Sequence, residues 1–451
     1  MTRPLMLFAA FGLQLCSVAF AQAINPQDTA AATPQNCLRI AAQVEQSLRH
    51  DDLDKLFPAA VDPQGGFFEN FAIDWTHQAV SPGGDLTRDV VYQSRLTWLA
   101  AQAAMRYPGQ SAAYLAYARH GAGFLAEKQW DKNQGGFWWS VDVSGRVAGS
   151  NNKHLYGNAF AIYALAAAYQ ATHDQADLDQ AKIAFHWLED HAHDAVNGGY
   201  FEQLRADGSH VSAGDAGSQP DQVLGAAPAQ KSMNAHIHIL ESLTGLLKVW
   251  PDPLLEKRTQ EVYQICLTKI YADPGYLHLF FSPDWRPAAG PDSFGHDIES
   301  AFLFSETAAA LGKSDDPACW SAGRALVDHC LKVGFDATSG SLNSEGPADG
   351  NGTSDRSRVW WVQAESLNAL LLMHERYGNE DARYWNAFVK QWNFIRTYQI
   401  DHKNGGWFNT LSADNTPLRS KLAKTDAWTE GYHQGRAMMC VIDRLNRLAS
   451  R

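Results

Sequence analysis

Two histidine residues have neighbours that favour proton transfer. His296 and Glu299 lie three residues apart in the segment FGHDIES, so on a helix they would share a face. A carboxylate beside an imidazole raises the pKa of the ring and fixes its tautomer, as a general base requires. His433, in the segment TEGYHQGR, supplies a second imidazole near the C-terminus. The alternative for His296 is a structural histidine at the start of a helix.

A second pair of histidines has to be considered as possible metal ligands. His236 and His238 alternate about Ile237 in SMNAHIHILES. On a helix, side chains two residues apart point about 200° from each other, so only one of these rings would face a given cavity. The pair lacks the i, i+4 spacing of helical zinc ligands, and no cysteine lies nearby. We therefore expect neither a metal nor a cofactor, and we expect activity to survive treatment with EDTA.

Polar and aromatic residues recur in six segments, each just before or within the start of an expected helix. Exposed aromatic rings in loops stack on sugar rings, although they also plug the ends of helical cores. Because all six segments contribute such groups, we expect the segments to meet around one site. Besides the histidines, the candidates are Arg95, Tyr156, Asn158, Asn234, Glu241, Asp297, Trp360, Trp361, Gln363, Glu365, Trp428 and Arg436.

Glycine-containing turns separate these segments. In WDKNQGGFWWS, residues 130–140, an aspartate precedes two glycines and then aromatic residues. Glycine reaches backbone angles closed to other residues, so this pattern predicts a tight turn that leads into a short strand. Related turns have their first glycine at 65, 135, 198, 275, 340 and 405, which spaces them 63 to 77 residues apart.

The sequence between turns reads as pairs of helices. Segments such as GNAFAIYALAAAYQAT and VQAESLNALLLMHERYG carry apolar residues at three-to-four spacing and are rich in alanine and leucine. Six helical hairpins could stack as an open solenoid or close into a ring. Open solenoids carry polar capping repeats, whereas the last repeat here is as apolar as the middle ones. We predict an all-α (α/α)6 toroid with short strand turns, whose inner helices present their N-terminal ends to a central cavity.

Composition limits the partners. The chain has 451 residues, 45% of them hydrophobic, and a formal net charge of −12, which disfavours nucleic acid and anionic membranes as partners. Beyond the N-terminal segment, no apolar stretch reaches the length of a membrane-spanning helix. A monomer or a homodimer is expected.

The N-terminus has the features of an export signal. An early arginine, an apolar run and Ala19-Phe20-Ala21 predict a signal peptide over residues 1–21, followed by a flexible segment over 22–34 and a single domain over 35–451. The surroundings of Cys16 make a poor lipidation motif, so we expect a soluble, exported, periplasmic protein. The five remaining cysteines are odd in number and widely spaced, which favours buried thiols over a disulfide framework.

The motifs taken together resemble a known family. KHLYGNAFAIYAL, MNAHIHILES, GHDIES, RVWWVQAE, GGWF and a terminal W-x4-H are similar to those of the N-acylglucosamine 2-epimerase superfamily, which includes cellobiose 2-epimerases and mannose isomerases. The resemblance covers essentially the whole mature chain. It implies an (α/α)6 barrel, no metal, and epimerisation or isomerisation at C1 and C2 of a free mono- or oligosaccharide through a cis-enediolate.

The resemblance also implies roles for single residues. His296 and His433 would be the two catalytic histidines, and His238 would help to open the sugar ring. Trp360 and Glu365, in the motif RVWWVQAE, are further candidates for substrate binding. Substrate-contact or supporting positions are matched by Arg95, Tyr156, Asn234, Glu299, Trp361 and Trp428.

Two departures from the family pattern bear on the substrate. Cellobiose 2-epimerases typically read W-K-C-P-Y-H-N where this chain has Trp428-Thr-Glu-Gly-Tyr-His433-Gln, and G-E-W-F-W where it has Gly-Gly-Trp407-Phe408-Asn409. The expected activity is a sugar 2-epimerase, with a mannose-type isomerase as the alternative. A glycoside hydrolase, which needs two carboxylates flanking a bond, and an exported sugar-binding protein are weaker alternatives.

Overall fold

The structure is a computed structural model that describes residues 31–78, 87–150, 152–212, 214–215, 221 and 223–451. The predicted signal peptide and residues 22–30 lie outside the described residues. Within the described part, α1 begins at Pro34, where Thr33 caps the helix by accepting the backbone N–H of Asn36 at 3.3 Å.

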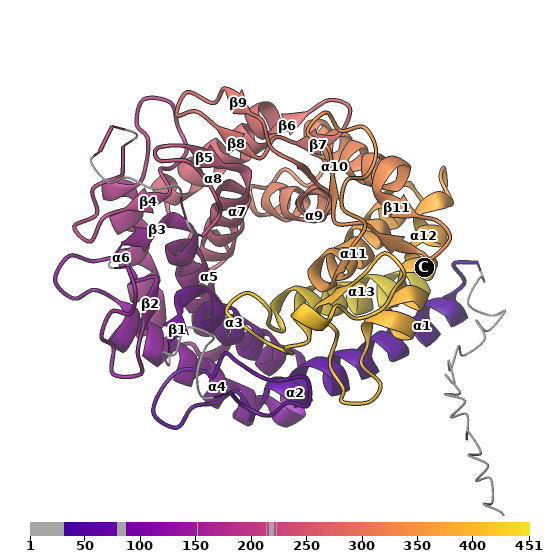
Figure 1. The fold of residues 1–451 in the computed structure, drawn as a ribbon, viewed down its shortest axis with the longest axis horizontal. Helices are drawn as coiled ribbons and strands as arrows, with labels where there is room; N and C mark the ends of the chain where they lie inside the picture. The colour runs from indigo at the N-terminus through magenta and orange to yellow at the C-terminus, as the bar shows by residue number, and fades with distance from the viewer. Residues whose placement is uncertain (1–30, 79–86, 151, 213, 216–220, 222) are drawn as a thin grey trace, which may run out of the picture.

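The described residues include twelve α-helices of 12 or more residues, arranged in two concentric rings (Figure 1). The inner ring consists of α3 (Val90–Arg106), α5 (Leu155–Thr172), α7 (Met233–Leu247), α9 (Phe294–Ala310), α11 (Trp360–Tyr377) and α13 (Tyr432–Ala449). The outer ring consists of α1 (Pro34–Ser47), α4 (Ser111–Phe124), α6 (Gln175–His191), α8 (Pro253–Ile265), α10 (Pro317–His329) and α12 (Arg383–Phe394). A short helix, α2 (Asp54–Leu56), follows α1.

Each inner helix packs mainly against one outer helix and also contacts its two inner neighbours. The outer partner is the next helix in the chain for five hairpins, such as α3 with α4. The sixth pair joins the ends of the chain, because α1 packs against α13, and α13 also contacts α3 to close the inner ring (Figure 1). The predicted (α/α)6 toroid of six helical hairpins is confirmed.

Burial explains why the two rings differ in sequence. Thirteen of the 15 residues of the inner helix α7 are buried, compared with five of the 13 residues of the outer helix α8. A helix surrounded by protein on all sides is apolar all round, whereas an outer helix keeps one polar face. The last helix, α13, is apolar because it belongs to the inner ring, as expected for a closed ring.

Short antiparallel strands precede the inner helices. The ladders that connect successive hairpins are β1 (Arg88–Asp89) with β2 (Ser140–Val141), β3 (Lys153–His154) with β4 (Gln203–Leu204), β5 (Lys231–Ser232) with β8 (Phe280–Phe281) and β9 (Pro287–Ala288), β10 (Asp292–Ser293) with β13 (Glu345–Gly346), and β14 (Arg358–Val359) with β15 (Thr410–Leu411). Two further ladders flank turns: β6 (Tyr271–Ala272) with β7 (Tyr276–Leu277), and β11 (Phe335–Asp336) with β12 (Ser341–Leu342). A bridge between Phe71 and Thr425 closes the same pattern across the chain ends.

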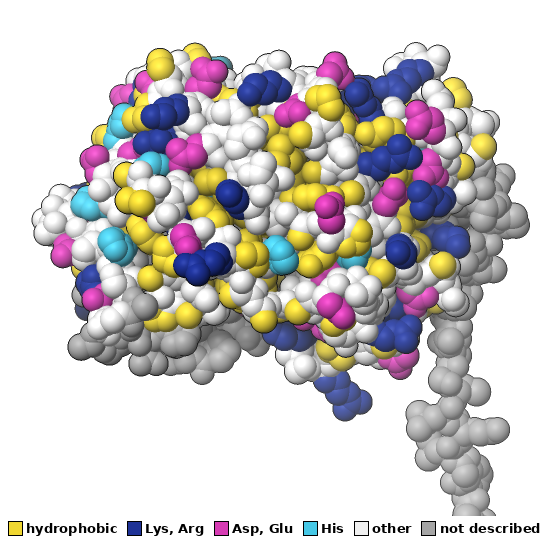
Figure 2. Space-filling view, turned by 90° about the horizontal axis from the view of Figure 1, so that it is seen from above, with side chains coloured by type: hydrophobic (Ala, Val, Ile, Leu, Met, Phe, Trp, Pro, Cys, Tyr) yellow, Lys and Arg dark blue, Asp and Glu magenta, His cyan; other side chains and the backbone are white. Residues whose placement is uncertain are grey.

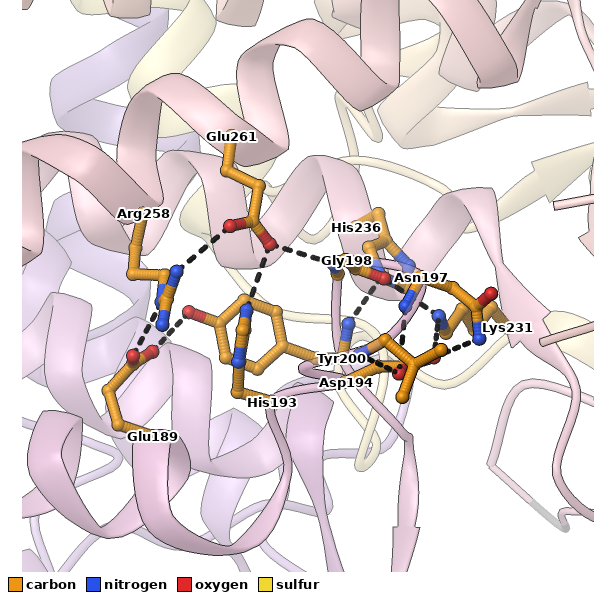
Figure 3. A network of polar contacts seen from close by, with 12 residues as sticks. Glu189, His193, Asp194, Asn197, Gly198, Tyr200, Lys231, His236, Arg258 and Glu261 are labelled. Atoms are coloured by element: carbon orange, nitrogen blue, oxygen red, sulfur yellow. Dashed lines mark hydrogen bonds and ion pairs between the residues drawn. The ribbon is translucent and has the colours of Figure 1, made fainter. Parts of the chain in front are cut away.

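The fourth residue of five inner helices clamps the turn that precedes the helix. His236, for example, accepts the backbone N–H of Tyr200 at 3.1 Å through Nε2 (Figure 3). Side chains in the first turn of a helix lean back toward its N-terminus, which brings them to the turn. The clamps are Gln93, Asn158, His236, Asp297 and Gln363, which accept the backbone N–H of Phe67, Phe137, Tyr200, Leu277 and Leu342.

A buried ion pair ties most turns to the strand before the next inner helix. Figure 3 shows one of them, in which Lys231 Nζ binds Asp194 Oδ2 at 2.7 Å. The other pairs are Arg88 with Asp62, Lys153 with Asp131, Arg358 with Asp336, and Lys424 with Asp401. Before α9 the position of the cation is taken by Asp292, which binds His329 Nε2 at 2.7 Å.

The remaining sequence expectations concern thiols, membranes and charge. Cys37, Cys266, Cys319 and Cys330 are buried free thiols, and Cys440 is partly buried. No described helix is long and apolar enough to cross a bilayer. On the face of the molecule drawn in Figure 2, acidic and basic side chains are interspersed with apolar ones. The expectation that no nucleic acid binds stays a prediction.

Candidate active site

The predicted residues meet in a cavity of about 270 Å³ at the N-terminal ends of the inner helices. Most of its lining residues occupy the first six positions of α3, α5, α7, α9, α11 or α13, whereas Trp428 comes from the loop before α13. Nine of the eleven residues to which the family resemblance gives a role line it: Arg95, Tyr156, Asn234, His238, His296, Trp360, Trp361, Trp428 and His433. The other two, Glu299 and Glu365, lie fully buried beside it.

Each of the three cavity histidines is held through Nδ1. His433 Nδ1 binds Glu365 Oε1 at 2.9 Å, and His238 Nδ1 binds Glu241 Oε2 at 3.0 Å. A carboxylate partner fixes the tautomer with the proton on Nδ1, so the lone pair of Nε2 is available to the cavity. His296 Nδ1 lies 2.7 Å from Ser293 Oγ. Among the described residues, no hydrogen-bond partner occupies Nε2 of any of the three rings.

The predicted pairing of His296 with Glu299 is wrong. His296 lies in the first turn of α9 and leans back to Ser293, whereas Glu299 Oε1 lies 3.7 Å from His433 Nδ1. The pKa of His296 is lowered rather than raised: burial, reinforced by His238 and Arg95, brings it to about 3. Burial likewise lowers the pKa of His433 well below its usual range. Both imidazoles are therefore neutral at physiological pH and able to accept a proton.

Arg436 holds a cluster of carboxylates beneath the cavity. Its guanidinium binds Glu365 Oε1 at 2.7 Å, and it also binds Glu241 and Glu299. Burial raises the pKa of Glu299 to about 7, whereas the Arg436 charge overcomes burial and brings the pKa of Glu241 to about 2. The hydroxyl of Tyr432 donates to Glu241 and accepts from Arg436. Arg436 and the three glutamates thus form a buried cluster of charged groups beneath the histidines.

A second arginine faces the cavity from α3. Arg95 Nη1 donates to Glu430 Oε1 at 3.1 Å, and Nη2 donates to the hydroxyl of Tyr156 at 3.0 Å. Its guanidinium carbon lies 4.3 Å from the centre of the Phe160 ring, which adds a cation–π contact. Since Tyr156 accepts from Arg95, its own proton is free to be donated into the cavity.

Tryptophan rings form much of the remaining wall. The Trp361 ring contacts both catalytic candidates, with its centroid 4.8 Å from that of His296 and 5.4 Å from that of His433. The ring centroid of Trp428 lies 6.0 Å from that of Tyr156. Trp428 is 38% exposed, which makes it the most exposed residue of this wall. Flat apolar faces beside hydrogen-bonding groups are the chemistry that binds sugar rings.

Three clusters of described residues have donor atoms close enough to hold a metal ion: His154, Glu202 and Asp221; Asp292, Asp297 and His329; and Glu299, Glu365 and His433. In the third cluster, Arg436 Nη2 already binds both glutamates, so a positive charge occupies the place of a dication. His236 takes no part in any of them; it is fully buried and bound to Ser232 and Tyr200. As predicted, only one of the pair His236 and His238 faces the cavity.

Several residues of the site could not be named from motifs alone. Val223 and Leu224 line the cavity from a long connection before α7 that carries no motif. Ser293 is an ordinary residue in the sequence, and only the structure places it against His296. Glu430 lies where this chain differs from the family motif W-K-C-P-Y-H-N, and this difference is the sequence feature that points to it.

Comparison with known proteins agrees with this geometry. The sequence profile of the N-acylglucosamine 2-epimerase (GlcNAc 2-epimerase) family matches residues 66–434. A cellobiose 2-epimerase of Bacteroides fragilis is 31% identical over 84% of this chain and 91% of its own, and a D-mannose isomerase of Marinomonas mediterranea is 27% identical over 83% and 91%. The solved cellobiose 2-epimerase from Spirochaeta thermophila superposes with a TM-score of 0.78 at 30% identity, covering 92% of this chain and 98% of that one. The chain therefore belongs to the N-acylglucosamine 2-epimerase family.

Proposed function

We propose that the protein is a sugar 2-epimerase, an isomerase acting at C1 and C2 of a free reducing sugar through a cis-enediolate. The observation that carries the proposal is the meeting of three imidazoles in one cavity, each held at Nδ1 with Nε2 left for a substrate. Arg95 and Tyr156 add donors beside them, and the relatives act on sugars according to their names.

Ring opening comes first, because the hydrogen on C2 is acidic only when C1 is a carbonyl. The anomeric O1–H loses its proton, the bond from C1 to the ring oxygen breaks, and the ring oxygen is protonated. We assign this transfer to His238, whose Nδ1–H is held by Glu241. The lone pair on Nε2 takes the first proton, and the imidazolium returns it.

Enolisation follows. A neutral imidazole takes the proton from C2, and the electron pair moves to form C1=C2 with negative charge on O1. Arg95 and Tyr156 donate toward that oxyanion in a partly dry cavity. If His296 and His433 act as a pair, the neutral ring removes the proton from C2, and the other ring enters the step already protonated at Nε2 and delivers that proton to the opposite face of C2. The product is the 2-epimer, and the two rings have exchanged protonation states. The lowered pKa of each ring favours the neutral form that the proton acceptor needs.

The alternative product is a ketose. If the enediolate is protonated at C1 while O2 becomes the carbonyl, the same residues carry out an aldose–ketose isomerisation, as the D-mannose isomerase relative would suggest. A glycoside hydrolase is disfavoured by one observation. Its two carboxylates would have to flank a glycosidic bond, whereas Glu299 and Glu365 both bind the same nitrogen of Arg436.

The proposal extends to the place of action. An N-terminal segment with the pattern of a signal peptide, residues 1–21, supports export to the periplasm. We propose a monomer or a homodimer there. Cell fractionation with an antibody, and N-terminal sequencing of the exported protein, would test this. A chain that keeps Met1 and stays with cytoplasmic markers would contradict export.

The decisive experiment follows deuterium. The purified protein is incubated in D2O with glucose, mannose, N-acetylglucosamine and cellobiose, and C1 and C2 are observed by NMR. Deuterium at C2 of a new epimer supports the 2-epimerase, and a ketose labelled at C1 supports the isomerase. Sugars that bind with no exchange at either carbon would contradict both and support a sugar-binding protein.

A further inference from the structure

Glu430 is a buried carboxylate directly behind the cavity. It lies in the loop before α13, is 1% exposed, and binds Arg95 Nη1 through Oε1. None of the sequence motifs assigns it a role. Burying a glutamate carboxylate in a site this dry costs desolvation free energy, so we expect a functional role for this side chain.

A small internal cavity of about 10 Å³ lies on the far side of Glu430. Five residues that line it carry buried polar atoms with no protein partner among the described residues: the indole N–H groups of Trp360 and Trp407, Asp52 Oδ2, Glu430 Oε2 and Gln434 Oε1. A water molecule accepts two hydrogen bonds and donates two, so one molecule in this space could serve both indole N–H groups and two of the three acceptors. Trp360 lines both this small cavity and the larger cavity that holds the histidines.

The charges around Glu430 come from several elements. Burial raises its pKa to about 7, opposed by Arg95 on α3 and reinforced by Asp426 in the same loop. Asp52, which follows α1, faces it with the same sign, and burial raises the pKa of Asp52 as well. Tyr92 is a further neighbour. Arg95 is the cation that Glu430 faces directly, so the two form a unit.

We propose that Glu430 is a positioning residue that holds Arg95 in place to stabilise the oxyanion of the reaction. The chain of contacts runs from Glu430 through Arg95 to the hydroxyl of Tyr156 in the cavity. Glu430 aligns the guanidinium along this line and offsets its charge before substrate binds. This inference rests on the proposed function, since it concerns the same enediolate.

The first test replaces the charge and keeps the shape. In Glu430→Gln the side-chain oxygen still accepts from Arg95, but the bond loses its charge assistance, so kcat should fall about tenfold with KM changed less than about twofold. Glu430→Asp keeps the charge at a shorter reach and should be impaired less than the Gln variant. The matched control is Glu69→Gln, a carboxylate 2% exposed that binds Asp89 N and Gln93, and its kcat should be unchanged.

The second test is a double-mutant cycle with Arg95→Gln. If Glu430 acts through Arg95, Glu430→Gln should have no further effect on kcat once the guanidinium is gone. A tenfold loss that persists in the Arg95→Gln background, or an unchanged kcat in Glu430→Gln alone, would overturn the inference. An Asp variant more impaired than the Gln variant would do the same. These results are separate from the proposed function, which fails only if the unmodified protein exchanges no sugar hydrogen at C1 or C2.

Discussion

At the scale of single residues, the cavity histidines share a design but differ in their support. His433 and His238 each lean on a glutamate, whereas His296 leans on the hydroxyl of Ser293. A carboxylate strengthens an imidazole as a base more than a hydroxyl does, because it stabilises the imidazolium that forms. The tautomer of His433 is thus held more firmly than that of His296, whose hydroxyl partner can donate or accept.

Removing either ring should abolish most of the activity. We expect His296→Ala and His433→Ala each to lower kcat at least about a hundredfold, the usual contribution of a general acid or base. Ser293→Ala should cost less, about tenfold, because it removes only the group that orients His296. His50→Ala, at an exposed surface ion pair with Asp54, is the control and should keep full activity. Steady-state kinetics with the sugar found by deuterium exchange measures all four.

His236 makes the fold sensitive to acid. Burial lowers its pKa to about 3, below the usual value of 6.5. Between these two pH values the ring is protonated in the unfolded chain but neutral in the folded protein. The stability that this ring contributes is present above pH 6.5 and is lost as the pH falls toward 3, by roughly 2–3 kcal/mol at pH 4.5.

A substitution taken from the other hairpins should remove this sensitivity. α3 and α11 use glutamine as the same clamp, so His236→Gln can still accept the backbone N–H of Tyr200. We expect the variant to gain stability over the unmodified protein at pH 4.5 relative to pH 8, as measured by urea denaturation at both values. An equal difference at the two pH values would show that the ring does not titrate as described.

At the scale of elements, regular spacing made most of the fold predictable. The turns before each inner helix recur with their aspartate and glycine, and the helices have clear apolar periodicity, so six hairpins follow from the sequence. The fate of single polar side chains did not follow. Asn158 and Gln363 look like cavity residues in the motifs, yet they clamp turns from the fourth position of their helices. The direction in which a first-turn side chain leans, which spacing along the chain does not reveal, decides such cases.

Two glycines near α4 should respond oppositely to alanine. Gly136 has φ +76°, and an added Cβ would lie 2.7 Å from the Trp187 ring, so Gly136→Ala should destabilise the protein by about 2 kcal/mol or more. Gly123 lies within α4 with nothing within 4 Å of an added Cβ, so Gly123→Ala should stabilise it by about 0.5–1 kcal/mol. Thermal melts of both variants check the signs, and a shift in the same direction would contradict the assignment of the turn.

At the scale of the whole molecule, closure of the ring depends on the two ends of the chain. α1 supplies the outer partner of α13, and the bridge from Phe71 to Thr425 completes the last strand pair. Gly431 approaches Asp52 and Leu56 so closely that an added Cβ would lie 2.3 Å from each. The segment that follows α1, which includes Asp52 and Leu56, therefore packs closely against the loop that precedes His433.

Shortening the chain should separate the two parts of its N-terminus. A protein that begins at Ala31 keeps Thr33 and the whole of α1, so we expect it to fold and to retain activity. A protein that begins at Asp54 lacks α1 and exposes the apolar face of α13, and we expect it to aggregate or to unfold at a much lower temperature. Light scattering and circular dichroism distinguish the outcomes. A stable, active protein without α1 would mean that the inner ring stands alone.

The pairing of α1 with α13 also sets the order in which the molecule can be completed. Among the described helices, α1 is synthesised first and α13 last. The contact between them, which closes the ring, therefore joins segments that are far apart in the sequence. Five hairpins can form from neighbouring segments while synthesis continues, but His433 and Arg436 arrive with the final helix. A chain broken off before that helix has most of the scaffold and none of the assembled chemistry. The active site can therefore assemble only after α13 has been synthesised.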